Sequence, residues 1–202
     1  MKKIVCIAVI MLCGVKVGAI EAVTDVGVGY VCAWQSVCTG GSTDGMVVGA
    51  AGIAAYVGWF FNDNVGISLN LFANPFIPAQ VYYAPEDCFT QRADYLETPI
   101  IDFASGLALR FALTDSILLL FGLNLNCLRF DYDVKDESKI YTNLGLGLDS
   151  RLHCMFTDGF GLVVAITAHY SLMTYISMQG WAMADEFNTI AVRPAIMLTF
   201  YR

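Results

Sequence analysis

The stretch 140–171, IYTNLGLGLDSRLHCMFTDGFGLVVAITAHYS, contains two long alternating runs joined at Thr157-Asp158-Gly159. In each run, apolar residues alternate with small or polar ones over about fifteen residues, which is the period of a β-strand with two different faces. A strand of a globular protein usually has roughly 5–6 residues. A tilted strand that crosses a membrane and continues past the headgroups is longer. The stretch therefore predicts a hairpin of a transmembrane β-barrel.

The same alternation recurs along the chain and predicts eight strands. Three short turns, 62–64, 114–116 and 157–159, each place an aspartate between two apolar runs, and longer loops separate the other strands. Short turns that alternate with long loops are typical of bacterial outer-membrane barrels. We therefore expect an all-β, eight-stranded, antiparallel up-and-down transmembrane barrel with both termini in the periplasm and long loops outside. The expected strands are 23–34, 46–61, 65–72, 101–113, 119–126, 140–156, 160–172 and 189–202.

The N-terminus has the pattern of a secretory signal peptide. Met1-Lys2-Lys3 is a basic region, the apolar run 4–15 follows it, and Val17-Gly18-Ala19 supplies small residues for cleavage. The apolar run is too short for a stable membrane-spanning helix. We expect a signal peptide over 1–19 and a barrel domain over 20–202, with cleavage after Ala22 as the second choice.

The composition favours a membrane environment and excludes several partners. The chain is 57% apolar and 14% charged, with a mean hydropathy of +0.60. Cleavage after Ala19 removes three of the 11 basic residues, and the eight that remain face 18 acidic ones, for a net charge of about −10. This charge argues against binding of nucleic acid or anionic membrane surfaces. Eleven acids against three basic residues in the long loops give that side a balance of −8.

A polytopic helical protein is the main structural alternative. The stretches 45–61 and 160–184 carry no charged residue and have the length of membrane helices. However, the runs 101–113 and 140–156 carry charged residues in mid-segment. In an alternating strand, all of these charged residues lie on the same face as the neighbouring Gly and Ala residues. On helices, such charges would enter lipid at roughly 2.5–3.5 kcal/mol each, whereas on strands they all enter the lumen. The barrel is therefore the favoured fold. These charges are Asp102, Arg110, Asp149 and Arg151.

The polar and charged residues that the alternation places on the inner face of the barrel define the candidate site. An eight-stranded barrel has an interior about wide enough to be filled by side chains. Charged groups in it are expected to pair as a plug or to form the constriction of a narrow channel. The predicted lumen residues are Asp102, Arg110, Asn124, Asn126, Asp149, Arg151, His153, His169 and Arg193.

Five cysteines remain after cleavage, and they indicate neither a metal nor a redox site. The sequence has no CxxC motif and no His-Cys cluster, so we expect no metal and no cofactor. Cys32 and Cys38 could form a disulfide bridge in an oxidising compartment. For Cys127 and Cys154, a role as small apolar residues on the lipid-facing surface is equally expected. The pairing stays open. The five are Cys32, Cys38, Cys88, Cys127 and Cys154.

The strand plan resembles the eight-stranded outer-membrane families of the OmpA, OmpX and OmpW types, and the Cys and Gly content is similar to that of spirochaete proteins. In those families the last strand ends in an aromatic residue, whereas here Phe200 is followed by Tyr201 and Arg202. The resemblance implies a non-enzymatic outer-membrane protein, first a narrow OmpW-like channel for small molecules. The alternative is a closed OmpX- or OmpA-like barrel whose acidic loops act as an adhesin or envelope contact. The expected partners are outer-membrane lipid and a small solute or a surface ligand. The sequence does not determine the oligomeric state.

One motif suggests an enzyme. His169-Tyr170-Ser171 resembles the His-x-Ser pair of lipid A deacylase barrels, in which a strand histidine activates a serine. Residues two apart on a strand share a face, but here Leu172 stands where those enzymes have Asn, and parity points the pair inward. The deacylase is therefore the third hypothesis.

Overall fold

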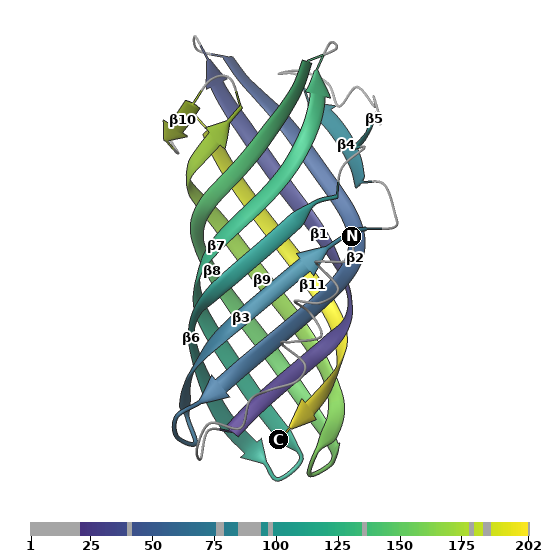
Figure 1. Cartoon of the computed structure of the whole chain (residues 1–202), viewed down its shortest axis with the longest axis vertical. Helices are drawn as coiled ribbons and strands as arrows, with labels where there is room; N and C mark the ends of the chain where they lie inside the picture. Colours follow the sequence, from purple (N-terminus) through teal and green to yellow (C-terminus); the bar gives the residue numbers. More distant parts are fainter. Residues whose placement is uncertain are drawn as a thin grey trace.

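The computed structural model describes residues 21–39, 42–75, 79–84, 94–96, 99–134, 137–177, 180–183 and 187–201. Within these residues, eight long strands form the wall of a barrel, and three short strands attach at one end (Figure 1). The long strands are β1 (Glu21–Thr39), β2 (Ser42–Phe60), β3 (Val65–Ala73), β6 (Ile101–Thr114), β7 (Ile117–Val134), β8 (Glu137–Thr157), β9 (Phe160–Ile176) and β11 (Phe187–Tyr201). The short strands are β4 (Ala79–Ala84), β5 (Asp94–Leu96) and β10 (Gly180–Met183).

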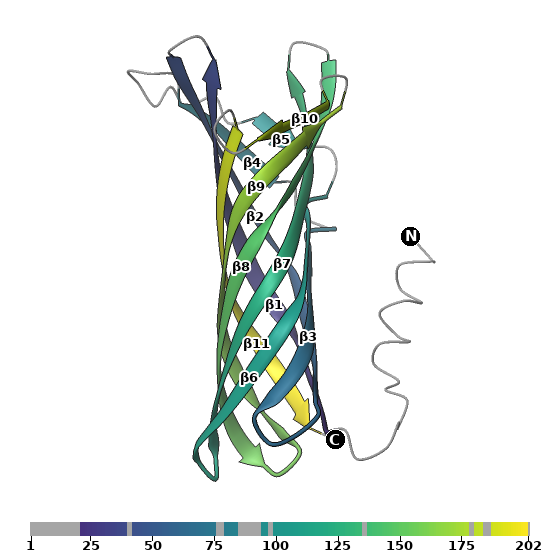
Figure 2. The same ribbon diagram turned by 90° about the vertical axis from the view of Figure 1, so that its left-hand side faces the viewer.

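The sheet closes on itself because β1 pairs with both β2 and β11. All pairings are antiparallel, and the wall follows the order β1-β11-β9-β8-β7-β6-β3-β2. Figure 2 shows the resulting tall cylinder, with three short turns and the C-terminus at one end (the turn end) and long hairpins at the other (the hairpin end). The predicted fold class is confirmed. The expected signal peptide lies outside the described residues.

The helical alternative is wrong, because both of its candidate spans lie in strands. Residues 45–60 belong to β2, and 160–176 form β9. Among the described residues, no helix is long and apolar enough to cross a membrane.

Several strands are longer than the sequence predicts. The expected loop 35–45 is a continuation of the hairpin, with Thr39 paired to Ser42, and the expected loop 131–139 pairs up to Val134 and Glu137. Outside the lipid, paired strands need backbone hydrogen bonds but no apolar outer face. The alternation of apolar residues therefore ends before the strands do. The two longest predicted loops likewise contain β4, β5 and β10.

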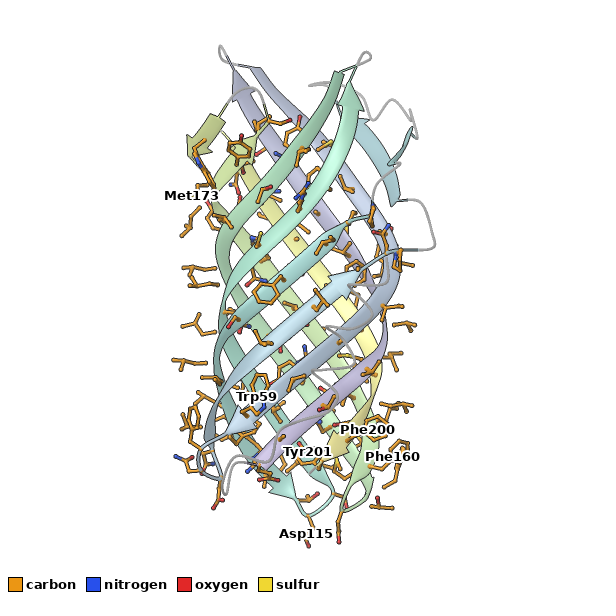
Figure 3. The ribbon with its side chains drawn as sticks, in the orientation of Figure 1. Trp59, Asp115, Phe160, Met173, Phe200 and Tyr201 are labelled. Carbon is orange, nitrogen blue, oxygen red and sulfur yellow. The ribbon has the colours of Figure 1, made fainter. Side chains whose placement is uncertain are left out.

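The outer face carries a continuous apolar band. Leu125 on β7 and Leu148 on β8 are 69% and 64% exposed, which is expected for lipid contact and not for water. Aromatic side chains lie toward both ends of the band. Phe160 and Phe200 lie at the turn end (Figure 3), and Trp34 on β1 and Trp181 on β10 lie in the strand parts near the hairpin end. Such aromatic girdles lie at the two interfaces of a membrane barrel.

A β-bulge changes the parity of β9. Leu144 pairs with Met173 and Gly145 pairs with Ser171, so β9 has one extra residue at Leu172. Up to Ser171 the inward residues are odd-numbered, and beyond the bulge Thr174 is the buried one. The bulge therefore keeps a polar residue inside the barrel near the hairpin end.

Candidate functional site

The structure places all nine predicted lumen residues inside the barrel. Each is buried, with at most 7% of its surface exposed. They come from β6, β7, β8, β9 and β11, and the closed wall brings them to one axis. Their role as a constriction stays a prediction. The residues are Asp102, Arg110, Asn124, Asn126, Asp149, Arg151, His153, His169 and Arg193.

Arg151 is the centre of the largest charged cluster. Its guanidinium, 1% exposed, donates hydrogen bonds to Asp149 on the same strand and, over 3.2 Å, to Asp25 on β1. The Tyr56 ring stacks on it, with the ring centroid 3.8 Å from Cζ. Asp149 and Asp25 are both buried. Their pairing with Arg151 offsets the free-energy cost of removing these charges from water, which would be large for an unpaired charge.

A second ion pair lies above the first, toward the hairpin end. Arg193 donates to Asp102 across 2.8 Å and to the Thr167 hydroxyl across 3.2 Å. Thr167 donates in turn to Asp149 over 2.7 Å, and Asn70 donates to both Thr167 and Asp149. The two ion pairs are therefore parts of one hydrogen-bonded network that crosses the lumen.

A third ion pair is at the turn end. Arg110 binds the exposed Glu21 carboxylate at 2.7 Å and donates to the Asp63 carbonyl at 2.8 Å, while its guanidinium lies over the Phe60 ring. It borders a polar pocket of about 600 Å³ at the barrel mouth, which also contacts Asp115 and Tyr201. Figure 3 shows Asp115 at the tip of a turn beside this mouth.

The predicted set of lumen residues omits four members of the network. Asp25, Tyr56, Asn70 and Thr167 face the lumen with the predicted residues. The inward position of Asp25 could have been predicted from the sequence. The outward-facing apolar residues of β1 occupy alternate positions from Val26 onward, so the residue before Val26 faces the lumen. Tyr56 and Thr167 carry no formal charge, so only the structure reveals that they contact Arg151 and Asp149.

Above the network, the lumen is largely apolar, apart from a hydrogen-bonded polar group formed by Asn143, Ser171, Thr174 and Thr189. Side chains from several strands fill it, and Phe130 stacks on Tyr141 with ring centroids 5.4 Å apart. A second apolar cluster fills the turn-end part around Phe60 and Leu120. The described lumen is thus packed, with charges in its middle. The buried residues at the hairpin end include Val31, Val48, Ala50, Phe72, Ile100, Leu128 and Phe130.

Beside this part of the lumen, the described ladder of β2 is interrupted on one side. β2 pairs there with β3 from Ile53 to Phe60 and with β4 from Gly45 to Gly49, so on this side residues 50–52 have no ladder partner among the described residues, while on the other side they pair with β1. Facing the interruption, β3 ends at Ala73, and Asn74 and Pro75 follow it. Asn74 is tied by two hydrogen bonds to Ile100 at the start of β6. The Ala73 backbone and the Phe72 ring both lie close to Gly52.

An apolar groove of about 620 Å³ on the lipid-facing surface reaches the same interruption. It runs over β9, β11, β1 and β2, and several of its side chains are exposed to the membrane. Its lining includes Val28, Tyr30, Ile53, Pro75, Val164 and Ile196.

The described residues give no support to a catalytic or metal site. His169 and Ser171 are both sealed inside the wall, and the Ser171 hydroxyl accepts a hydrogen bond from the Thr189 amide. No group of three or more potential metal ligands occurs among the described residues. Cys32, Cys127 and Cys154 are free thiols, and the side chains of Cys38 and Cys88 lie outside the described part.

Solved structures of small outer-membrane barrels share this architecture. The outer membrane protein OprG from Pseudomonas aeruginosa is 14% identical, with a TM-score of 0.57 over 90% of this chain and 95% of that one. The outer membrane protein AlkL, solved by solid-state NMR in lipid bilayers, is 10% identical, with a TM-score of 0.57 over 94% of each chain. This chain has the fold of these outer-membrane β-barrels.

The comparisons establish the fold and not the activity. The outer-membrane protease OmpT from Escherichia coli also matches, at 8% identity and a TM-score of 0.53 over 91% of this chain and 96% of that one. The same barrel therefore supports different functions. The spirochaete resemblance has no support in these comparisons. No family model and no curated protein matches the sequence.

Proposed function

We propose that this barrel passes small apolar molecules from its hairpin end sideways into the membrane, with the hairpin end outside the cell and the turn end in the periplasm. The observation that carries the proposal is the interruption of the β2 ladder at residues 50–52, which have no partner on one side among the described residues. It lies between an apolar section of the lumen and an apolar groove on the lipid-facing surface. A solute that leaves by this route never has to enter water.

The charged network argues against a straight route to the periplasm. Arg151, Asp149 and Asp25 fill the axis below the apolar section, and Arg193 with Asp102 covers them. An apolar solute would have to break these buried ion pairs, which costs several kcal/mol per uncompensated charge. Lateral exit above the network avoids this cost.

Phe72 is the residue that closes the proposed route. It is fully buried, belongs to the apolar cluster, and its ring lies against Gly52 at the interruption. Entry of a solute therefore requires a rotation of this ring or a shift of the chain at Asn74 and Pro75. Such side-chain and loop motions are fast compared with the exchange of whole strands.

The test is uptake by cells that express the barrel in an otherwise intact outer membrane. Phe72→Ala should speed the entry of a small apolar fluorophore and leave the entry of a zwitterionic amino acid unchanged. Phe60→Ala is the matched control, because it removes an equally buried ring below the network. Both changes leave a comparable cavity, each costing about 3–5 kcal/mol of stability.

Equal effects of the two variants would contradict the lateral route, and so would wild-type cells that take up the fluorophore no faster than cells without the barrel. Faster entry of the amino acid through Phe72→Ala would instead indicate an axial pore.

A second function is favoured by the height of the hairpins. β1–β2 and β7–β8 remain paired well beyond the apolar band (Figure 2), and the sequence of the long loops has a net charge of −8. Such a surface attracts basic partners. Replacing the acidic residues of the β7–β8 hairpin by their amides should weaken binding of expressing cells to a polylysine-coated surface if this hairpin acts as an adhesin, and unchanged binding would exclude that role for it. The residues to replace are Asp131, Asp133, Asp136 and Glu137.

A further inference from the structure

We propose that the apolar solute carries one uncharged hydroxyl group, and that a polar site around Gly147, immediately above the charged network, binds that group. The inference rests on the proposed route for apolar molecules and defines their chemical class more closely. It draws on buried polar atoms without hydrogen-bond partners, on their position around a glycine, and on the apolar side chains next to them.

Two lumen side chains above the network have polar atoms that no described residue satisfies. They are both heteroatoms of the Asn126 amide and both ring nitrogens of His169. Only 2% of Asn126 and 3% of His169 is exposed, so bulk water does not solvate them. Buried polar groups nearly always have hydrogen-bond partners, and a group left without one costs free energy. A bound molecule that supplies these partners is therefore favoured at this place.

The two side chains lie on either side of Gly147 on β8. His169 on β9 is the ladder partner of Gly147. From the other side, the Asn126 amide of β7 lies over Gly147, in the place that a Cβ atom would take. The next inward position of β8 toward the hairpin end is also a glycine, Gly145. Because neither glycine has a side chain, the inner face of β8 beside the two polar groups is bare backbone.

Apolar side chains adjoin this site on the neighbouring strands. Leu128 is the next inward residue of β7 after Asn126. Ala191 on β11 pairs with His169. Leu128 and Ala191 both belong to the apolar cluster of the hairpin end. Ligand sites commonly combine such an apolar lining with a few placed polar groups. A solute whose apolar part lies against this cluster can therefore place a terminal polar group beside Gly147.

The two side chains offer hydrogen-bond donors and acceptors but no formal charge. The Asn126 amide supplies a carbonyl acceptor and an NH₂ donor, and a neutral imidazole supplies one donor and one acceptor. A hydroxyl group both donates and accepts, so it can bind to both residues at once. An ionised head group would instead lose its water beside charges that already pair with one another, which is strongly unfavourable.

The experiment measures binding to the mature barrel refolded in lipid nanodiscs with ¹⁵N-labelled histidine. The chain has two histidines, so a His169→Gln variant assigns both sets of ring resonances. Addition of 1-naphthalenemethanol should shift the resonances of His169. It should leave those of His153, which lies beside Asp25 on the other side of the network, unchanged. 1-Methylnaphthalene lacks the hydroxyl group and should bind about fivefold more weakly or less, the value of about one hydrogen bond.

Asn126→Leu is the informative variant, because it nearly keeps the size of the side chain and removes the amide. It should weaken binding of the alcohol by about fivefold or more and leave binding of 1-methylnaphthalene unchanged. Gln35→Met is the matched control, since it removes another buried amide of the lumen, on β1, whose ladder partners are Thr189 and Met46. Binding of the alcohol to this variant should equal that of the wild type. Gel mobility without heating checks the folding of each variant.

No shift of His169 with the alcohol would overturn the inference and would leave the unpartnered atoms to ordered water. Equal binding of the alcohol and 1-methylnaphthalene would also overturn it, as would equal losses in Asn126→Leu and Gln35→Met. Tighter binding of 1-naphthylmethylamine would show a site for a cation instead. These results leave the lateral route standing, because binding is measured without transport, whereas failure of the route appears in the uptake by wild-type cells.

Discussion

Arg151 pairs with two buried carboxylates, those of Asp25 and Asp149. We expect Arg151→Met to lower the free energy of unfolding by about 3–5 kcal/mol, because Asp25 and Asp149 would stay buried without their shared partner. Urea unfolding in lipid vesicles, followed by tryptophan fluorescence, measures this change. Arg129→Met, on the exposed outer surface of β7, should change the unfolding free energy much less. Similar losses in the two variants would mean that the network contributes little.

At this scale the sequence predicts which residues face inward but not which of them pair. Strand parity is local, and it places all nine predicted side chains inside. Partners such as Arg193 and Asp102 are 91 positions apart, and only the closure of β1 against β11 fixes how the strands are shifted against one another. Pairing therefore had to come from the structure.

At the scale of strands, glycine permits the close approach of β8 and β9. A Cβ atom at Gly145 would lie 1.9 Å from the Tyr170 carbonyl oxygen, which belongs to the backbone and cannot move aside alone. We expect Gly145→Ala to cost about 1–3 kcal/mol of stability, as overpacking does. Gly159→Ala in the turn, where the nearest atom is 3.7 Å away, is the control and should be nearly neutral in the same unfolding assay. Equal stability of the two variants would show that the strands can separate at no cost.

Strand ends are where the sequence is least informative. The hairpins β1–β2 and β7–β8 continue past the end of their apolar alternation, because outside the lipid backbone hydrogen bonds are enough to keep the strands paired. The bulge at Leu172 is also invisible in the pattern: one inserted residue exchanges the two faces beyond it, and apolar residues on both sides of the bulge hide the change.

At the scale of the whole molecule, the barrel combines a filled lumen with a β2 ladder that is interrupted on one side among the described residues. Alternation over 15-residue runs was enough to predict the eight-stranded architecture, since only a closed barrel satisfies every backbone group in lipid. The interruption at residues 50–52 could not be predicted, because it depends on β2 changing partner from β3 to β4. A narrow aqueous channel, as the resemblance implies, would need a lumen free of the network around Arg151.

Single-channel recording of the mature barrel in a planar bilayer with concentrated KCl tests the plugged lumen most directly. We predict no sustained conductance steps at any voltage that the bilayer withstands, because buried ion pairs and apolar side chains fill the axis. Stable open steps from the folded wild-type barrel would contradict the account and would establish an axial pore.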